Sequence, residues 1–186
     1  QTVHAVAARD YSPAQLEAWA PHDEQHQRTL AKRLAAQVSV GVKECGILIG
    51  FGTLSDAGAE EGAAFAESGG SDAGSDDAAM QAARAANAEA PAAAANAGAS
   101  AVAAKSGELD MLYVHKDRQR QGVATRIADE LEHLARQRGW RTIRTFASKT
   151  ARPFFARRGY RVLRSNIAVR QGVELENYVM EKALER

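Results

Sequence analysis

The chain has 186 residues, 45% hydrophobic and 25% charged, which predicts one globular domain of ordinary size with a single core. Its one cysteine, Cys45, excludes an intrachain disulfide and favours a reducing compartment, so we expect a cytoplasmic protein. No apolar run has the length of a membrane-spanning helix, and no membrane partner is expected. The formal net charge of +1 is unevenly divided, because residues 56–106 carry eight acids and two bases and the remainder carries 22 bases against 15 acids. A basic folded part suits an anionic ligand or nucleic acid.

Local signals predict helices and a hairpin in the first third of the chain. Ser12 is a typical N-cap, Pro13 suits the first helical position, and Gln15 completes a capping box. Asp23 is a second N-cap candidate. We expect helices at 2–9, 13–19 and 24–36, and strands at 38–42 and 47–54 joined by a turn at 43–46.

Residues 56–106 differ in composition from the rest of the chain. Alanine makes up 23 of these 51 residues, and Phe65, Met80 and Val102 are the only large apolar side chains. Short alanine-rich helices are marginal in water, and this segment offers little apolar surface to a core. We therefore expect a disordered, low-complexity insertion between two neighbouring strands, with an interaction arm as the alternative.

The remaining residues predict a strand, a long amphipathic helix, a second strand, a short helix and a closing hairpin. We expect these elements at 108–114, 123–138, 142–146, 151–158, 160–169 and 173–180. A strand–helix–strand unit implies a parallel pair with a right-handed crossover, and hairpins imply antiparallel neighbours. The predicted fold class is α/β, with a mixed, mostly antiparallel central sheet and helices on both faces.

The segment LYVHKDRQRQGVA, residues 112–124, joins the first of these strands to the long helix. A strand that turns sharply into a helix directs backbone N–H groups and the positive end of the helix dipole at one point. This geometry binds phosphate, and small residues at Gly122 and Ala124 allow close approach of a ligand, which we expect to be a pyrophosphate. The candidate binding residues are Leu112, Tyr113, Val114, Arg118, Gln119, Arg120, Gln121, Gly122, Val123 and Ala124.

The pattern Gln119-x-x-Gly122-x-Ala124 resembles the coenzyme A signature Q/R-x-x-G-x-G/A of the GNAT superfamily of N-acetyltransferases. Residues 148–160, SKTARPFFARRGY, resemble the family's later segment N-x-x-A-x-x-x-Y-x-x-x-G-F, and 160–184 have the character of its closing hairpin. The resemblance covers 38–54 and 108–184 well and 3–36 loosely. It implies one acetyltransferase domain over residues 1–186, interrupted at 56–106. GNAT domains usually open with a strand, so we expect that an N-terminal strand is missing here.

The resemblance also implies how the thioester of acetyl-CoA, the expected cosubstrate, would be held. The strand ending at Val114 would carry a bulge, and backbone N–H groups there, with that of Val114 as the first candidate, would stabilise the oxyanion. Divergence of this strand from residues 142–146 would make a slot for the pantetheine arm.

Two carboxylates are candidates for the catalytic base that deprotonates the acceptor amine. Glu108 lies where histone-type members of the superfamily place a glutamate, and Asp110 lies two residues further along the same strand. Either could act directly or through water, and the alternative is that both are exposed carboxylates at the start of a strand.

Two positions depart from the family pattern. Phe155 stands where many members use a tyrosine to protonate the leaving thiolate, and Ser148 stands at the family's asparagine position. We expect Phe155 to be an apolar wall beside the thiol, Ser148 to hydrogen-bond the pantetheine arm, and Phe154 to pack in the core. The five histidines show no metal-ligand spacing with Cys45, so no metal is expected.

The sequence therefore predicts acetyl transfer to a primary amine of a small molecule or protein, by direct attack in a ternary complex. The first alternative is a GNAT domain that binds acyl-CoA without catalysis, as a sensor or regulator. A basic nucleic-acid-binding module is a weaker alternative, because interleaved aromatic residues and a recognition-helix pattern are lacking. The partners implied are acetyl-CoA and an amine acceptor, and a homodimer is compatible with them.

Overall fold

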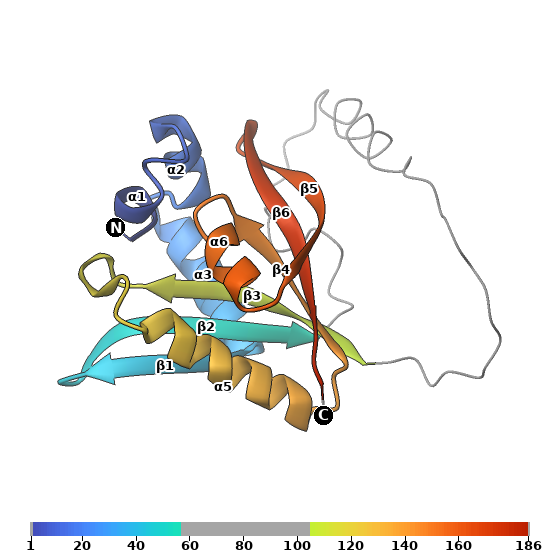
Figure 1. The fold of residues 1–186 in the computed structure, drawn as a ribbon. Helices are drawn as coiled ribbons and strands as arrows, with labels where there is room; N and C mark the ends of the chain where they lie inside the picture. The colour runs from blue at the N-terminus through green and yellow to red at the C-terminus, as the bar shows by residue number, and fades with distance from the viewer. Residues whose placement is uncertain (1, 57–104, 186) are drawn as a thin grey trace. The chain divides into compact units, whose positions relative to one another are not determined.

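The structure, a computed structural model, describes residues 2–56 and 105–185. Its helices and strands are α1 (Thr2–Val6), α2 (Pro13–Trp19), α3 (Glu24–Ala36), β1 (Val38–Glu44), β2 (Ile47–Asp56), β3 (Ser106–Val114), the 3-10 helix η1 (Lys116–Arg118), α5 (Val123–Gln137), β4 (Thr142–Ser148), α6 (Arg152–Arg157), β5 (Arg161–Arg170) and β6 (Val173–Ala183). Figure 1 shows their arrangement.

The strands form one six-stranded sheet in the order β1-β2-β3-β4-β6-β5. Only β3 and β4 are parallel, and α5 connects them as a crossover helix, whereas every other neighbouring pair is antiparallel. The mixed, mostly antiparallel sheet predicted from the sequence is confirmed. Strands β2 and β3, which flank the predicted insertion, are antiparallel neighbours, and Asp56 pairs with Gly107. The insertion itself lies outside the described residues apart from its two ends.

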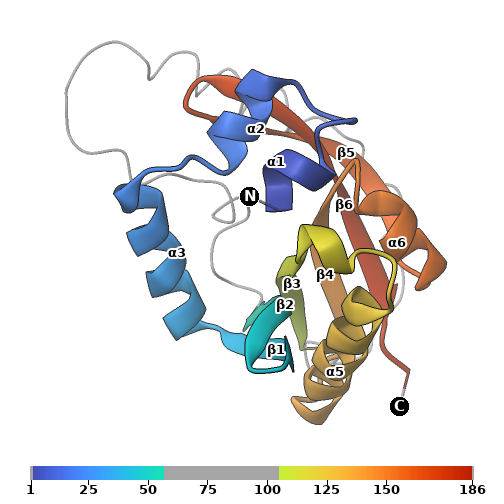
Figure 2. The ribbon, with the colours of Figure 1, turned by 90° about the vertical axis from the view of Figure 1, so that its left-hand side faces the viewer.

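Helices cover both faces of the sheet, as expected. Figure 2 shows α1, α2 and α3 on one face and α5 and α6 on the other. The main core lies between α5 and the sheet, where Ile127 and Leu131 of α5 are fully buried with Ile143 of β4. The part of the chain described contains no helix with the length and apolarity to cross a membrane.

Helix α5 rests directly on the backbone of β2. A Cβ added to Gly50 would lie 2.9 Å from Cγ1 of Val123, and one added to Gly52 would lie 2.8 Å from side-chain atoms of both Ile127 and Leu131. Real Cβ contacts of this length are not tolerated without a shift, so both positions require glycine for the helix to sit at this distance.

The N-terminal helices form a second, smaller core with the β5–β6 hairpin. Tyr11 and Leu16 pack there with Leu175 of β6. The capping box predicted at Ser12 is present, since Ser12 Oγ accepts from the Gln15 N–H and the Gln15 side chain accepts from the Ser12 N–H. Asp23 caps α3 through a 2.6 Å bond from the His26 N–H. Both predicted helix starts are therefore confirmed.

A buried ion cluster ties α5 to the C-terminal elements. The Glu132 side chain is only 4% exposed and accepts from Arg158 at 2.9 Å and from Lys182 at 2.7 Å. Charges in this environment are stable only when they are paired, so the cluster depends on all three residues. Burial and the neighbouring Glu132 charge raise the pKa of the Tyr160 hydroxyl well above its ordinary value.

Candidate functional site

The loop between β3 and α5 is held by side-chain amides of its two glutamines. Gln119 Nε2 donates to the carbonyl oxygens of Val114 at 2.7 Å and His115 at 3.3 Å, and Gln121 Nε2 donates to that of Asp117 at 3.3 Å. These bonds satisfy carbonyl groups within the loop. The two predicted binding residues thus have a structural role in fixing the loop.

The first turn of α5 presents backbone N–H groups without helical acceptors. Gly122 is the N-cap, with a left-handed φ of 78° and no side chain to accept a capping bond. The ladder of the helix begins with the Arg126 N–H, which donates to the Gly122 carbonyl at 3.0 Å. The N–H groups of residues 123–125 therefore have no acceptor within the helix, at the positive end of a 15-residue dipole. This arrangement suits an anion, as the sequence predicted.

Several cations flank this turn, and two of them are already paired. Arg118 contacts the Glu44 carboxylate at 2.7 Å, and Lys116 contacts Asp117 at 2.8 Å, all four side chains being well exposed. Arg120, in a left-handed conformation with φ of 62°, makes no ion pair with any residue in the described ranges. The loop thus keeps a basic character, with one cation free for an incoming anion.

Strand β3 carries a bulge at Asp110. Thr53 of β2 pairs with Met111 and Leu54 pairs with Leu109, so Asp110 is an extra residue in β3. The bulge reverses the alternation of side chains along the strand: Leu109 faces the α5 core before it, whereas residues 112 and 114 face that core after it. The expected bulge thus lies four residues before Val114, and the role of the Val114 N–H stays a prediction.

Strands β3 and β4 separate beyond their first residues. Their parallel pairing runs from Ser106 and Thr142 only to Glu108 and Arg144, although β3 continues to Val114 and β4 to Ser148. The facing edges of the two strands beyond this point are not joined by ladder pairs. A divergence of this kind leaves backbone donors and acceptors for an extended ligand.

Glu108 lies at the point where the two strands separate. Burial is the main cause that raises the pKa of its carboxyl from an ordinary value of 4.5 to about 7, and the neighbouring Asp110 charge raises it further. The cations of Arg33 and Arg144 oppose this shift. A carboxyl that titrates near neutral pH can accept a proton there, which is the property required of a general base.

Asp110 is held by α3. Both of its carboxylate oxygens lie 2.7 Å from Nη2 of Arg33, and one accepts from Nε2 of Gln37 at 2.6 Å. The Asp110 side chain is only 3% exposed. Because its acceptor capacity is used in this way, Asp110 joins α3 to β3, and its oxygens are less available to accept a proton from a substrate.

The other predicted residues of β3 and the following helix lie on two faces. Val114 and Val123 are buried in the α5 core, with the side chains of Leu112 and Ala124 packed against it. Tyr113 points to the opposite face, where its ring contacts Phe51 at a centroid distance of 5.5 Å. Burial raises the pKa of the Tyr113 hydroxyl above its ordinary value.

Ser148 and Phe155 lie near each other in the chain but play different parts. Ser148 Oγ accepts from the Ala151 N–H at 3.1 Å and so stabilises the turn into α6. Phe155 is 2% exposed and packs edge-on against Tyr160, while Phe154 is half-buried at the rim of the core. Both rings thus contact the main core, Phe155 more deeply, and the place of Phe155 beside the thiol stays a prediction.

Tyr11 connects the N-terminal helices to the end of β4. Its hydroxyl donates to the Glu176 carbonyl at 2.6 Å and accepts from the Lys149 N–H at 3.0 Å. Its ring packs edge-on against Trp19, whose carbonyl accepts from Arg170 at 3.3 Å. These contacts place α1 and α2 against the face of the sheet that carries Glu108 and Asp110.

Sequence reasoning missed three residues that shape this site. Arg33 and Gln37 hold Asp110, and Glu44 pairs with Arg118. The spacing of Arg33 and Gln37 places both on one face of a helix, which was the only available signal. Their partner could not be identified, because it lies more than 70 residues away in the chain.

The sequence matches the profile of a known protein family. The sequence profile of the acetyltransferase (GNAT) domain matches residues 53–182. No protein with a curated description matches the sequence.

Three solved structures share the fold. A GCN5-related N-acetyltransferase (aminotransferase, class II) from Rhodopseudomonas palustris is 26% identical, with a TM-score of 0.65 over 98% of this chain and 83% of its own. The PaiA N-acetyltransferase of Thermoplasma acidophilum, in complex with coenzyme A, is 15% identical, with a TM-score of 0.58 over 98% and 86%. A ribosomal-protein-alanine N-acetyltransferase from Brucella melitensis is 15% identical, with a TM-score of 0.53 over 98% and 90%. The last two likenesses concern the fold alone.

Proposed function

Because the chain belongs to the acetyltransferase (GNAT) domain family, we propose that it transfers an acetyl group from acetyl-CoA to a primary amine of a small molecule or protein. The observation that carries this proposal is the first turn of α5. It directs three backbone N–H groups, at residues 123–125, away from the helix beside a basic loop.

Acetyl-CoA would lie along β3. Its pyrophosphate would accept hydrogen bonds from the free N–H groups of α5, with Arg120 adding positive charge. Its pantetheine arm would follow the divergence of β3 and β4, where the backbone edges are unpaired beyond Glu108 and Arg144. The Thermoplasma protein, which has the same fold, was solved in complex with coenzyme A, which supports the choice of acetyl-CoA as cosubstrate.

Glu108 would deprotonate the acceptor ammonium, which has a pKa near 10 when free. The neutral amine then attacks the thioester carbonyl carbon directly, the C–N bond forms, and collapse of the intermediate breaks the C–S bond. Asp110 is the weaker candidate for this role because Arg33 and Gln37 occupy its oxygens.

The leaving group departs as a thiolate. Phe155 has no proton to give, so the thiolate takes its proton from solvent. The absence of a tyrosine at this position is also the observation that favours the alternative, a domain that binds acyl-CoA without transferring the acyl group.

Two glycines that flank α5 provide a matched test. Gly122 and Gly139 have nearly equal φ values, 78° and 77°, and a Cβ added to either would meet no atom within 4 Å. Valine at either position imposes the same backbone strain, about 1–2 kcal/mol. Only Gly122→Val places methyl groups where the phosphates would lie.

We therefore expect saturating acetyl-CoA to raise the melting temperature of the unmodified protein and of Gly139→Val by about 5–10 °C, and that of Gly122→Val much less. An equal shift in both variants would remove the phosphate assignment. Release of free thiol with a panel of amines then separates the two functions, because a sensor binds acetyl-CoA without amine-dependent turnover.

A further inference from the structure

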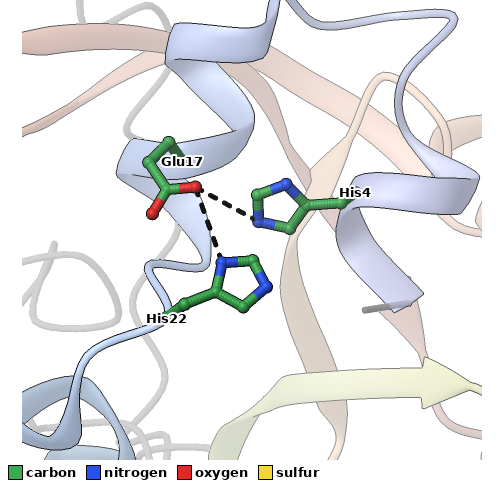
Figure 3. Close-up of side chains that lie close together, drawn as sticks. All are labelled: His4, Glu17 and His22. Atoms are coloured by element: carbon green, nitrogen blue, oxygen red, sulfur yellow. Dashed lines mark ion pairs between the residues drawn. The ribbon is translucent and has the colours of Figure 1, made fainter.

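The side chains of two histidines and a glutamate from the N-terminal segment lie close together. His4 lies on α1, Glu17 on α2, and His22 in the connection between α2 and α3. Figure 3 shows one oxygen of Glu17 facing both imidazole rings. The candidate ligand atoms all lie within 4.8 Å of one another, and no other such group of three occurs in residues 2–56 and 105–185.

The distances within this cluster fit metal coordination better than direct hydrogen bonding. Glu17 Oε2 lies 3.8 Å from His4 Nε2 and 3.6 Å from His22 Nδ1. Hydrogen bonds between nitrogen and oxygen are shorter, at about 2.7–3.2 Å. Ligands at 2.0–2.2 Å from a tetrahedral ion lie about 3.4 Å from one another, so small side-chain movements would close the set around one ion.

We propose that His4, Glu17 and His22 form a binding site for a divalent transition metal, with Zn²⁺ as the best match. Imidazole nitrogens and a carboxylate oxygen are ligands that Zn²⁺ accepts, whereas Ca²⁺ and Mg²⁺ require mostly oxygen. Three protein ligands leave the fourth tetrahedral position to water. Glu17 and His22 are 57% and 62% exposed, so the ion can enter from solvent.

One existing contact must change when the ion binds. His4 Nε2 lies 2.9 Å from the carbonyl oxygen of Ala20, which implies that this nitrogen carries the proton. To coordinate the ion through Nε2, the His4 ring must carry its proton on Nδ1 instead. The Ala20 carbonyl then accepts a hydrogen bond from water in place of the one from His4.

The position of the site predicts its effect. The three ligands come from α1, α2 and the segment that leads into α3, so one ion would connect all three helices. Trp19, two residues after Glu17, packs against Tyr11, which binds the end of β4. The ion would therefore hold the N-terminal helices in place against the sheet.

Zn²⁺ titration of chelator-treated protein, followed by calorimetry, tests the site. We expect one ion per chain, no heat with Mg²⁺, and affinity at least about tenfold weaker in both His22→Ala and Glu17→Gln. Saturating Zn²⁺ should raise the melting temperature of the unmodified protein by several degrees. Binding of Co²⁺ should give the intense visible absorption of a four-coordinate site.

His133→Ala is the matched control, because His133 is an exposed histidine on α5, away from the cluster, whose ring hydrogen-bonds with Gln137. It should bind Zn²⁺ as the unmodified protein does. Because Glu17 and His22 are well exposed, both site variants should melt normally without metal. Absence of one-to-one binding, or an unchanged affinity in His22→Ala, would overturn the proposal.

Discussion

Replacement of Glu108 by glutamine should have opposite effects on catalysis and on stability. The carboxyl has a pKa of about 7 in the folded protein against an ordinary 4.5, so the folded protein keeps a proton that the unfolded chain loses between these pH values. Stability must therefore fall as the pH rises through this window. The difference corresponds to about 3 kcal/mol, at 1.36 kcal/mol for each pKa unit, once Glu108 is fully ionised.

Glutamine has a similar shape and never ionises, so Glu108→Gln avoids this cost. The variant should match the unmodified protein near pH 4.5 and be more stable than it above about pH 7.5, by up to about 3 kcal/mol. Urea denaturation at several pH values measures this difference, and contributions of other titrating groups cancel between the two proteins. Glu130→Gln, on the exposed face of α5, is the matched control for the substitution itself.

Catalysis should respond in the other direction. Loss of a general base typically lowers the rate of the chemical step by about 100- to 10,000-fold. The unmodified enzyme should lose activity as the pH falls through about 7, because protonated Glu108 cannot accept a proton. This acid limb should be absent in Glu108→Gln, while the affinity for acetyl-CoA should be nearly unchanged. If Glu108→Gln keeps both its rate and its acid limb, the assignment of Glu108 as the base is refuted. If the two proteins are equally stable above pH 7, Glu108 is not buried in its neutral form.

Three further changes test the surrounding structure. Burial, and after it the Asp110 charge, raise the pKa of Glu108, so Asp110→Asn should move the acid limb part of the way to lower pH. Loss of the ion pair with Arg33 should also lower stability, and an acid limb that disappears instead would assign the base to Asp110. Glu132→Gln removes the buried carboxylate that pairs with Lys182 and Arg158, although Arg158 keeps its pair with Asp129. The change should cost about 3 kcal/mol in urea denaturation without affecting acetyl-CoA binding, whereas a neutral result would contradict the buried ion cluster. Replacing residues 57–104 by about four Gly/Ser residues should stabilise the protein by about 2 kcal/mol through a shorter loop between antiparallel neighbours, and a loss of cooperative unfolding would count against the predicted insertion.

Elements with local signals were predictable from the sequence. The helix starts at Ser12 and Asp23 follow from side chains that cap their own backbone. The two closing strands are joined by a turn that contains Gly172, which has a positive φ of 73°. The first hairpin differs from its prediction because Cys45 and Gly46 alone form the turn, with φ values of 49° and 80°. The flanking strands therefore extend further than the apolar residues alone indicated.

Features that depend on distant parts of the chain were not predictable. The bulge at Asp110 can be recognised only from the pairing of β3 with β2. The ion pair between Arg33 and Asp110 joins residues that are 77 positions apart in the sequence. Strand order is equally hidden, since the apolar residues Leu163, Ile167 and Val169 suggest a buried strand. They are exposed because β5 lies at the edge of the sheet.

The close packing of α5 against Gly50 and Gly52 of β2 determines which substitutions this protein can accept. Both glycines lie more than 60 residues before the loop between β3 and α5, which is proposed to bind phosphate. Yet a Cβ on Gly50 would meet Val123, the first residue of the helix that follows this loop. A methyl group at Gly50 would lift or tilt that end of the helix and so misdirect its N–H groups. Random mutagenesis selected for loss of acetyl-CoA binding should therefore yield substitutions at Gly50 alongside those in the loop, and a library confined to residues 116–124 would overlook them.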